Sequence, residues 1–306
     1  MRLKSALRRG VAAAVIAGIV VSSGIPAYAA RWNIADGDIT VRADDAEGKN
    51  RVSQGEKENV EDTDTVITGK SKEHTVTIDT SGGKVDVTFD DLKIDVSGKK
   101  EGDGSDDSPV DAGKAAVTVQ GGGDATIELD GDNKLKSGSG NAGLEKNKHE
   151  SKGTLTIKDD KGKDGSLTAE GGDDGAGIGG GIGSTGGSIT IRGGTIEAVG
   201  GSNAAGIGDG AGPWSEPDPD IPPSNPSNPN NIIICGDAEV TAKAGSQMTD
   251  AKAPAIGGKY GEVPTENLSD DEHKVTGGRL TRLNADGTVM EGMGYDYTST
   301  PTPQPD

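Results

Sequence analysis

The sequence predicts an all-β chain in which short strands wind into a parallel β-helix, a solenoid with a thin core. Apolar and small polar residues alternate in short runs, which is typical of strands. These runs recur in groups of three, and no helical stripe of apolar residues appears after the first 29 residues. Leu, Ile, Val and Phe make up only 53 of the 306 residues, a share typical of disordered chains. The prediction of a folded β domain therefore rests on the order of the residues and not on the composition.

The first 29 residues predict an export signal that is removed from the mature chain. Four basic residues precede an apolar run at 11–21, and Ala27-Tyr28-Ala29 has the small-x-small pattern that signal peptidases cleave. The apolar run is shorter than the roughly 20 residues that cross a bilayer, so we expect no retained membrane span. The mature protein is expected outside the cell, either released or associated with the cell surface.

Individual strands can be assigned in order along the mature chain. β-branched residues alternate with polar ones in segments that we expect to be strands: 39–41, 75–78, 85–89, 92–96, 117–119, 126–129 and 155–157. The charged, glycine-rich segments 44–64 and 98–115 are expected to be loops. Seven prolines between residues 213 and 231 predict an extended loop that leaves the solenoid.

From residue 125 onward the strands form a repeat of three. The clearest copies cover 153–179 and 187–208, a more divergent copy covers 231–258, and a fainter one covers 125–144. The equivalent apolar residues of the four copies are Leu144, Ile178, Ile207 and Ile256. Three short strands per repeat with variable turns are typical of a solenoid.

A parallel β-helix explains how few apolar residues can form a core, because each strand pairs with its equivalent in the next turn. We assign residues 30–262 to this domain and 263–306 to a peripheral segment with a Thr/Pro-rich tail. Glycines at the corners provide tightly bent backbone. One alternative stays open, that the Gly-rich runs are flexible linkers. An up-and-down barrel is the rival β architecture, but it predicts longer strands and tight hairpins, neither of which appears in the sequence.

Composition excludes several classes of function. Removing residues 1–29 removes four basic residues and no acidic one, which takes the net charge from −19 to −23. Nucleic-acid binding is not expected, because it needs a basic surface. A single Cys excludes an internal disulfide framework and a Cys-based zinc cluster.

Several motifs carry a resemblance to a known family. The opening at 31–41 and the motifs at 135–144, 175–181 and 194–208 are similar to a family of secreted bacterial carbohydrate-binding proteins. The resemblance implies a right-handed parallel β-helix like that of pectate lyases, on the surface of anaerobic plant-fibre and gut bacteria. It also implies binding of acidic pectic chains and cellulose, with calcium. The sequence departs from the family pattern at Pro254-Ala-Ile-Gly257 and in its Pro-rich insertion.

Acidic turns are the candidate metal site. Carboxylates recur at the expected corners of the repeat, where stacked turns could bring them together: Asp130, Asp132, Asp173, Asp174 and Asp209. Calcium binds six to eight hard oxygens in irregular geometry, so we expect calcium as the cofactor, mainly on the strength of the family resemblance. The alternative is that acidic turns keep a repetitive β surface soluble.

Basic and aromatic side chains are the candidate carbohydrate site. Lys134, Lys136 and Arg192 could pair with uronate carboxylates, although such residues often form only a solvated face. Trp32 and Trp214 could stack on sugar rings, although capping of the coil end is the favoured role for Trp32 and Trp214 falls in the Pro-rich loop.

These observations favour a non-catalytic, monomeric protein that binds an acidic or cellulosic polysaccharide, and the family resemblance implies that calcium assists. A structural or adhesive surface solenoid is the alternative. A polysaccharide lyase comes third and would use Arg192 or a lysine as the base.

Overall fold

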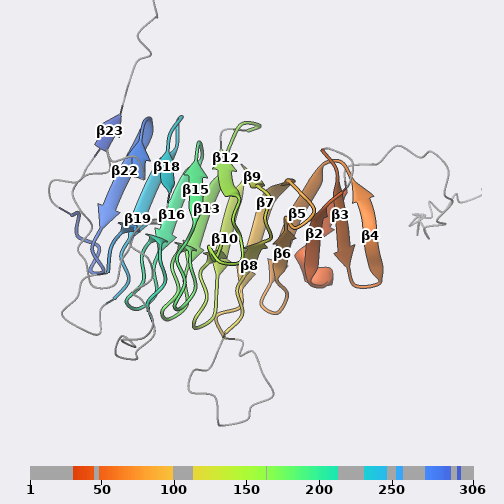
Figure 1. The fold of residues 1–306 in the computed structure, drawn as a ribbon, viewed down its shortest axis with the longest axis horizontal. Helices are drawn as coiled ribbons and strands as arrows, with labels where there is room; N and C mark the ends of the chain where they lie inside the picture. The colour runs from red at the N-terminus through yellow and green to blue at the C-terminus, as the bar shows by residue number, and fades with distance from the viewer. Residues whose placement is uncertain are drawn as a thin grey trace, which may run out of the picture.

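The computed structural model describes residues 30–44, 48–98, 113–162, 164–212, 231–246, 253–257, 273–290 and 295–297. Within them the chain forms twenty-three strands and one 3-10 helix, η1 (Ile34–Asp36), which confirms the all-β prediction (Figure 1). The export signal at 1–29 and most of the expected loops at 98–115 and 213–231 lie outside the described residues. Among the described residues, no helix has the length and apolar character needed to cross a membrane.

The N-terminal part contains eight strands: β1 (Arg31–Asn33), β2 (Ile39–Ala43), β3 (Asn50–Gln54), β4 (Lys57–Asp62), β5 (Thr65–Ser71), β6 (Val76–Asp79), β7 (Val85–Asp95) and β8 (Val117–Gln120). Strands β2, β3 and β4 pair antiparallel, so the prediction of a loop over 44–64 is wrong. The inward side chains Asn50 and Gln54 are polar, and they are satisfied by hydrogen bonds to Thr65 and to backbone carbonyls. This pattern lacks the apolar alternation by which strands are found in a sequence.

From β9 onward the chain repeats the same three-strand unit. The strands are β9 (Ala125–Asp130), β10 (Asp132–Lys136), β11 (Leu144–Glu145), β12 (Thr154–Lys158), β13 (Ser166–Glu170), β14 (Ile178–Gly179), β15 (Ser188–Ile191), β16 (Thr195–Val199), β17 (Ile207–Gly208), β18 (Ile232–Ile234), β19 (Glu239–Lys243) and β20 (Ile256–Gly257). Each strand from β9 to β19 pairs in parallel with the strand three places later, for example β9 with β12 and β10 with β13, and β20 ends the smaller sheet. Figure 1 shows these strands side by side along the longest axis.

Three further strands extend the larger sheet beyond residue 262. Strand β21 (His273–Val275) pairs in parallel with β18, and β22 (Gly278–Leu283) pairs in parallel with β19. Strand β23 (Tyr295–Tyr297) pairs antiparallel with β22. The segment expected to be peripheral therefore contributes two strands, β21 and β22, that follow the same parallel stacking.

The strands form two large, mainly parallel sheets. The smaller has the order β20-β17-β14-β11-β8-β6-β2-β3-β4. The larger has two arms that meet at β7, whose residues 85–90 pair with β9 and whose residues 93–95 pair with β10. The segments 85–89 and 92–96, expected as two strands, are thus one long strand.

The core consists of stacked columns of equivalent side chains. Leu144, Ile178, Ile207 and Ile256 lie in register across the smaller sheet, as the repeat predicted. Ile127, Ile157, Ile191 and Ile234 form a second column in the larger sheet. All eight side chains are buried. The register explains how a low apolar content suffices, because one apolar side chain from each repeat extends a continuous column.

Glycine is required at one corner of each turn, where successive backbones approach closely. A Cβ on Gly172 would overlap the carbonyl group of Gly138, and one on Gly201 would overlap that of Gly172. In the next turn, a Cβ on Gly245 would overlap the carbonyl group of Gly201. The recurrent glycines therefore allow the turns to stack.

Candidate functional site

A groove of about 490 Å³ lies on the outer face of β7, β9 and β12, bounded by the turns before β5 and after β12. Its walls carry five basic and five acidic side chains, together with several threonines. In the protein as a whole, acidic residues outnumber basic ones by 50 to 31. The groove is therefore a region in which positive and negative side chains are equal in number, on a molecule that is acidic as a whole.

Strand register places the groove side chains beside one another. Thr88 of β7 lies opposite Glu128 of β9, which in turn lies opposite Lys158 of β12. Because neighbouring strands are about 4.8 Å apart, these three side chains form a row across the sheet. A parallel row contains Thr126 and Thr156. The groove thus combines hydroxyl groups with charges at regular spacing.

Glu128 holds one wall of the groove in place. Its side chain is buried, and Oε1 accepts hydrogen bonds from the backbone nitrogens of Asp160 and Lys161, both at 2.7 Å. Its Oε2 forms an ion pair with Lys158 Nζ at 3.0 Å, although this contact is not aligned as a hydrogen bond. The hydrogen bond from Lys158 to Asp160, reinforced by Glu128, raises the pKa of Lys158 despite its partial burial.

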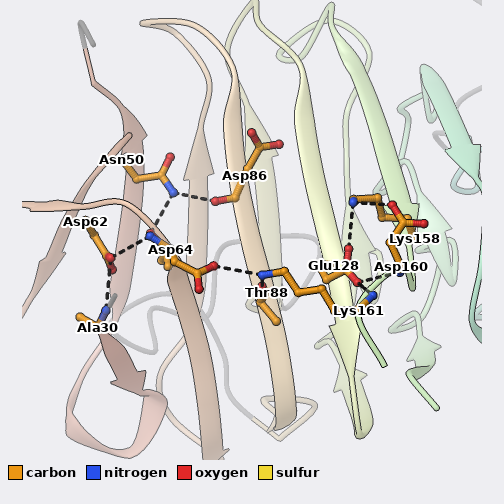
Figure 2. A network of polar contacts seen from close by, with 11 residues as sticks. Ala30, Asn50, Asp62, Asp64, Asp86, Thr88, Glu128, Lys158, Asp160 and Lys161 are labelled. Carbon is orange, nitrogen blue, oxygen red and sulfur yellow. Dashed lines mark hydrogen bonds and ion pairs between the residues drawn. The ribbon is translucent and has the colours of Figure 1, made fainter. Parts of the chain in front are cut away.

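Lys161 reaches across the groove (Figure 2). Its Nζ lies 3.1 Å from Asp64 Oδ1, in the turn between β4 and β5, and 3.5 Å from Thr88 Oγ1. Lys158 and Lys161 both contact carboxylates in this region, which leaves little uncompensated charge in the middle of the groove.

Arg192 lies on the β15 side of the groove. It follows β15 by one residue, and its backbone nitrogen donates to Ile157 O at 2.8 Å. The side chain is exposed, and its guanidinium forms no hydrogen bond or ion pair with the part of the chain that the structure describes. Arg192 is therefore a cation of the groove that is available to an external anion.

Lys134 and Lys136 do not line this groove. They lie on β10 in the other arm of the larger sheet, and both contact Glu170 of β13, at 2.7 and 3.0 Å. Partial burial would raise the pKa of Glu170, but the hydrogen bonds from Lys134 and Lys136 outweigh it and lower that pKa. A ligand carboxylate at this position would have to displace Glu170.

The tryptophan predictions need one correction. Trp32 is 3% exposed, its Nε1 donates to Asp62 Oδ2 at 2.7 Å, and Lys57 Nζ lies 5.3 Å from the ring centroid. The ring packs in the N-terminal end of the core, so it presents no free face for a sugar. Trp214 lies outside the described residues.

The five acidic turn residues do not gather into one cluster. Asp173 and Asp174 accept hydrogen bonds from Ser202 and Asn203 in the next turn, and Asp132 accepts one from Ser166. Asp209 accepts from the Gly186 nitrogen, and Asp130 lies exposed at the end of β9. Within the described ranges no group of three or more His, Cys, Asp or Glu residues is placed to hold a metal. Calcium at these turns stays a prediction.

Two features of the structure could not be predicted from the sequence. Glu128 and Thr88 follow the period-two alternation of their strands, which indicates that they face outward. The repeat begins only at residue 125, so the sequence does not indicate that β7 lies beside β9. Outside the groove, Lys146 is fully buried and donates to Ser151 O at 3.0 Å. No sequence signal distinguishes it from the exposed lysines around it.

Comparisons with protein-family models, curated proteins and solved structures find no match to this chain.

Proposed function

We propose that this chain is a secreted, non-catalytic polysaccharide-binding protein built on a right-handed parallel β-helix. Pairing of each strand from β9 to β19 with the one three places later supports a solenoid, since equivalent strands then stack turn upon turn. Crossover connections between parallel strands are right-handed in nearly all proteins, which supports the hand. The groove over β7, β9 and β12 is the proposed binding surface.

The observation that carries this proposal is the uncommitted guanidinium of Arg192 beside a groove of threonine hydroxyls. Hydroxyl groups donate and accept hydrogen bonds, which matches the hydroxyls of a sugar chain. A guanidinium binds a carboxylate through two parallel hydrogen bonds, which matches a uronate. We infer that a polysaccharide lies along the groove with an acidic group at Arg192.

The equal numbers of acidic and basic side chains in the groove reduce the electrostatic repulsion that an acidic ligand would meet. A mature chain at −23 repels polyanions in general. The groove has equal numbers of acidic and basic side chains, so the local repulsion is weaker there than over the rest of the surface. Calcium could reduce the remaining repulsion, and this is open to direct test.

Affinity electrophoresis in gels containing polygalacturonate tests the proposal, with sedimentation on insoluble cellulose as the second assay. We expect retardation of the wild-type protein and about a tenfold weaker interaction for Arg192→Gln, because a charge-assisted hydrogen bond is lost. Lys152→Gln is the matched control: it removes the same charge from an exposed residue outside the groove, and binding should be unchanged.

Each alternative predicts a different result. If retardation disappears with a chelator and returns with calcium, the interaction is calcium-assisted. Unchanged mobility in a panel of acidic and neutral glycans would reject polysaccharide binding and favour an adhesive or structural solenoid. Release of unsaturated uronates, detected by their ultraviolet absorbance, would instead identify a lyase.

A further inference from the structure

A buried carboxylate lies beside the first described residue of the chain. Asp62, the last residue of β4, has no exposed surface. Its Oδ1 accepts from the backbone nitrogens of Ala30 and Asp64, both at 3.2 Å, and its Oδ2 accepts from Trp32 Nε1 at 2.7 Å. Figure 2 shows the contact between Asp62 and Ala30.

All three donors to Asp62 are uncharged while Ala30 is part of a longer chain. Asp62 forms no ion pair with a lysine or arginine of the described segments. The ammonium of Lys57 is directed to the Trp32 ring, 5.3 Å from its centroid. A buried carboxylate without a cationic partner is unfavourable, because neutral donors replace only part of its lost hydration.

We propose that cleavage between Ala29 and Ala30 supplies the missing cation, so that the new α-ammonium group of Ala30 forms a buried ion pair with Asp62. A signal peptidase would hydrolyse the Ala29–Ala30 amide with one water molecule. The carbonyl carbon of Ala29 takes the oxygen and becomes a carboxylate. The nitrogen of Ala30 keeps its bond to Cα and takes the protons that make it an ammonium.

The position of this nitrogen is fixed independently of the cleavage motif. Ala30 O accepts from Val66 N at 3.2 Å, and Arg31 pairs with Val66 in the parallel register of β1 and β5. A terminus one residue earlier would leave a neutral amide beside Asp62, and one residue later would remove the donor. The small-x-small pattern ending at Ala29 and the position of Asp62 thus indicate the same bond.

The consequence is a fold that becomes more stable when the signal is removed. The ion pair would hold β1 and the Trp32 side chain against β4 and β5, which close the N-terminal end of the core. Pairing with Asp62 raises the pKa of the α-amino group above its ordinary range of about 7.7 to 8.0. The stabilisation is therefore complete below that range and is lost as the pH rises through the raised pKa. This inference does not depend on polysaccharide binding.

The test uses the full chain exported from a bacterial host. N-terminal sequencing and intact mass should show a protein that begins at Ala30. A second full chain carries one glycine inserted between Ala29 and Ala30, so that cleavage after Ala29 moves the amine one residue away. We expect the melting temperature of the wild-type protein at pH 6 to be about 5 °C higher, and the difference to shrink at alkaline pH.

Asp62→Asn is the decisive variant, because it keeps the shape and removes the charge. In this background the glycine insertion should no longer change the melting temperature. If the variant does not fold, the pKa of the Ala30 amine can be measured from its rate of acylation against pH, and it should exceed that of the glycine-extended protein. A different exported N-terminus, equal melting temperatures, or an ordinary amine pKa would overturn the proposal.

Discussion

Lys161 Nζ lies 3.1 Å from Asp64 Oδ1, although 97 residues separate them in the sequence. The pair joins the turn after β12 to the turn before β5 and so spans the groove (Figure 2). Both side chains are more than half exposed, at 57% and 52%, so water screens the interaction. Exposed pairs of this kind contribute less than about 1 kcal/mol to stability. We infer that the pair mainly sets the shape and charge of the groove.

Replacing Lys161 by alanine should therefore affect binding more than folding. The melting temperature should fall by less than about 3 °C. Affinity for an acidic polysaccharide should fall several-fold, because Asp64 then faces the groove without its counter-charge, whereas affinity for a neutral one should not change. Thermal scans and affinity electrophoresis measure the two effects. The double variant with Asp64→Asn should recover binding; equal losses for acidic and neutral chains would contradict this explanation.

The buried ammonium of Lys146 predicts an unusual dependence of stability on pH. Burial lowers the pKa of Lys146 to about 8, with Asp124 opposing and Lys148 reinforcing the shift. Between pH 8 and 10.5 the unfolded chain keeps a proton that the folded chain has lost, so the free energy of unfolding should increase with pH. The gain at this site is about 3 kcal/mol at most. Denaturant unfolding at several pH values measures it.

Lys146→Met is the matched variant, because it keeps a long side chain without a titrating group. Its free energy of unfolding should be flatter between pH 8 and 10.5 and no lower than that of the wild-type protein at pH 7. Superimposable pH profiles of the two proteins would show that Lys146 is not responsible.

Glu170 predicts a dependence of the same sign at acidic pH, where the free energy of unfolding should decrease as the pH falls. Partial burial opposes its ionisation, but hydrogen bonds from Lys134 and Lys136 lower the pKa of Glu170 below its ordinary 4.5. The stabilisation is present above pH 4.5 and is lost as the pH falls through the lowered value. Glu170→Gln should destabilise the protein at pH 7 by about 1 kcal/mol and have a smaller effect at pH 3. Urea unfolding at both pH values tests this, and an unchanged difference would argue against it.

The sequence was sufficient to predict the stacked part of the fold. One apolar residue recurs at the same position of each repeat: Leu144, Ile178, Ile207 and Ile256. Because the repeats stack with equivalent positions in register, these side chains fall into one column. The hairpin of β3 and β4 could not be found in this way, since Asn50 and Gln54 occupy inward positions and are satisfied only by partners elsewhere in the chain.

The candidate site was predicted less completely. Arg192 was identified because a cation next to acidic turns is visible in the sequence. The row of Thr88, Glu128 and Lys158 depends on the pairing of β7, β9 and β12, which alternation within each strand does not specify. The burial of Trp32 depends on its hydrogen bond to Asp62, thirty residues away.

The close approach of backbone at Gly172, Gly201 and Gly245 predicts a large difference in stability between two alanine substitutions. In Gly201→Ala the new Cβ would overlap the carbonyl group of Gly172 in the preceding turn, and backbone cannot move aside without disturbing the pairing of both turns. We expect a loss of at least about 2 kcal/mol in the free energy of unfolding. Gly122→Ala is the control, since its Cβ would meet nothing within 4 Å. Its stability should stay within about 0.5 kcal/mol of wild type. Urea unfolding of both variants decides the matter: a shared midpoint would show that close approach of the turns is not what requires glycine at residue 201.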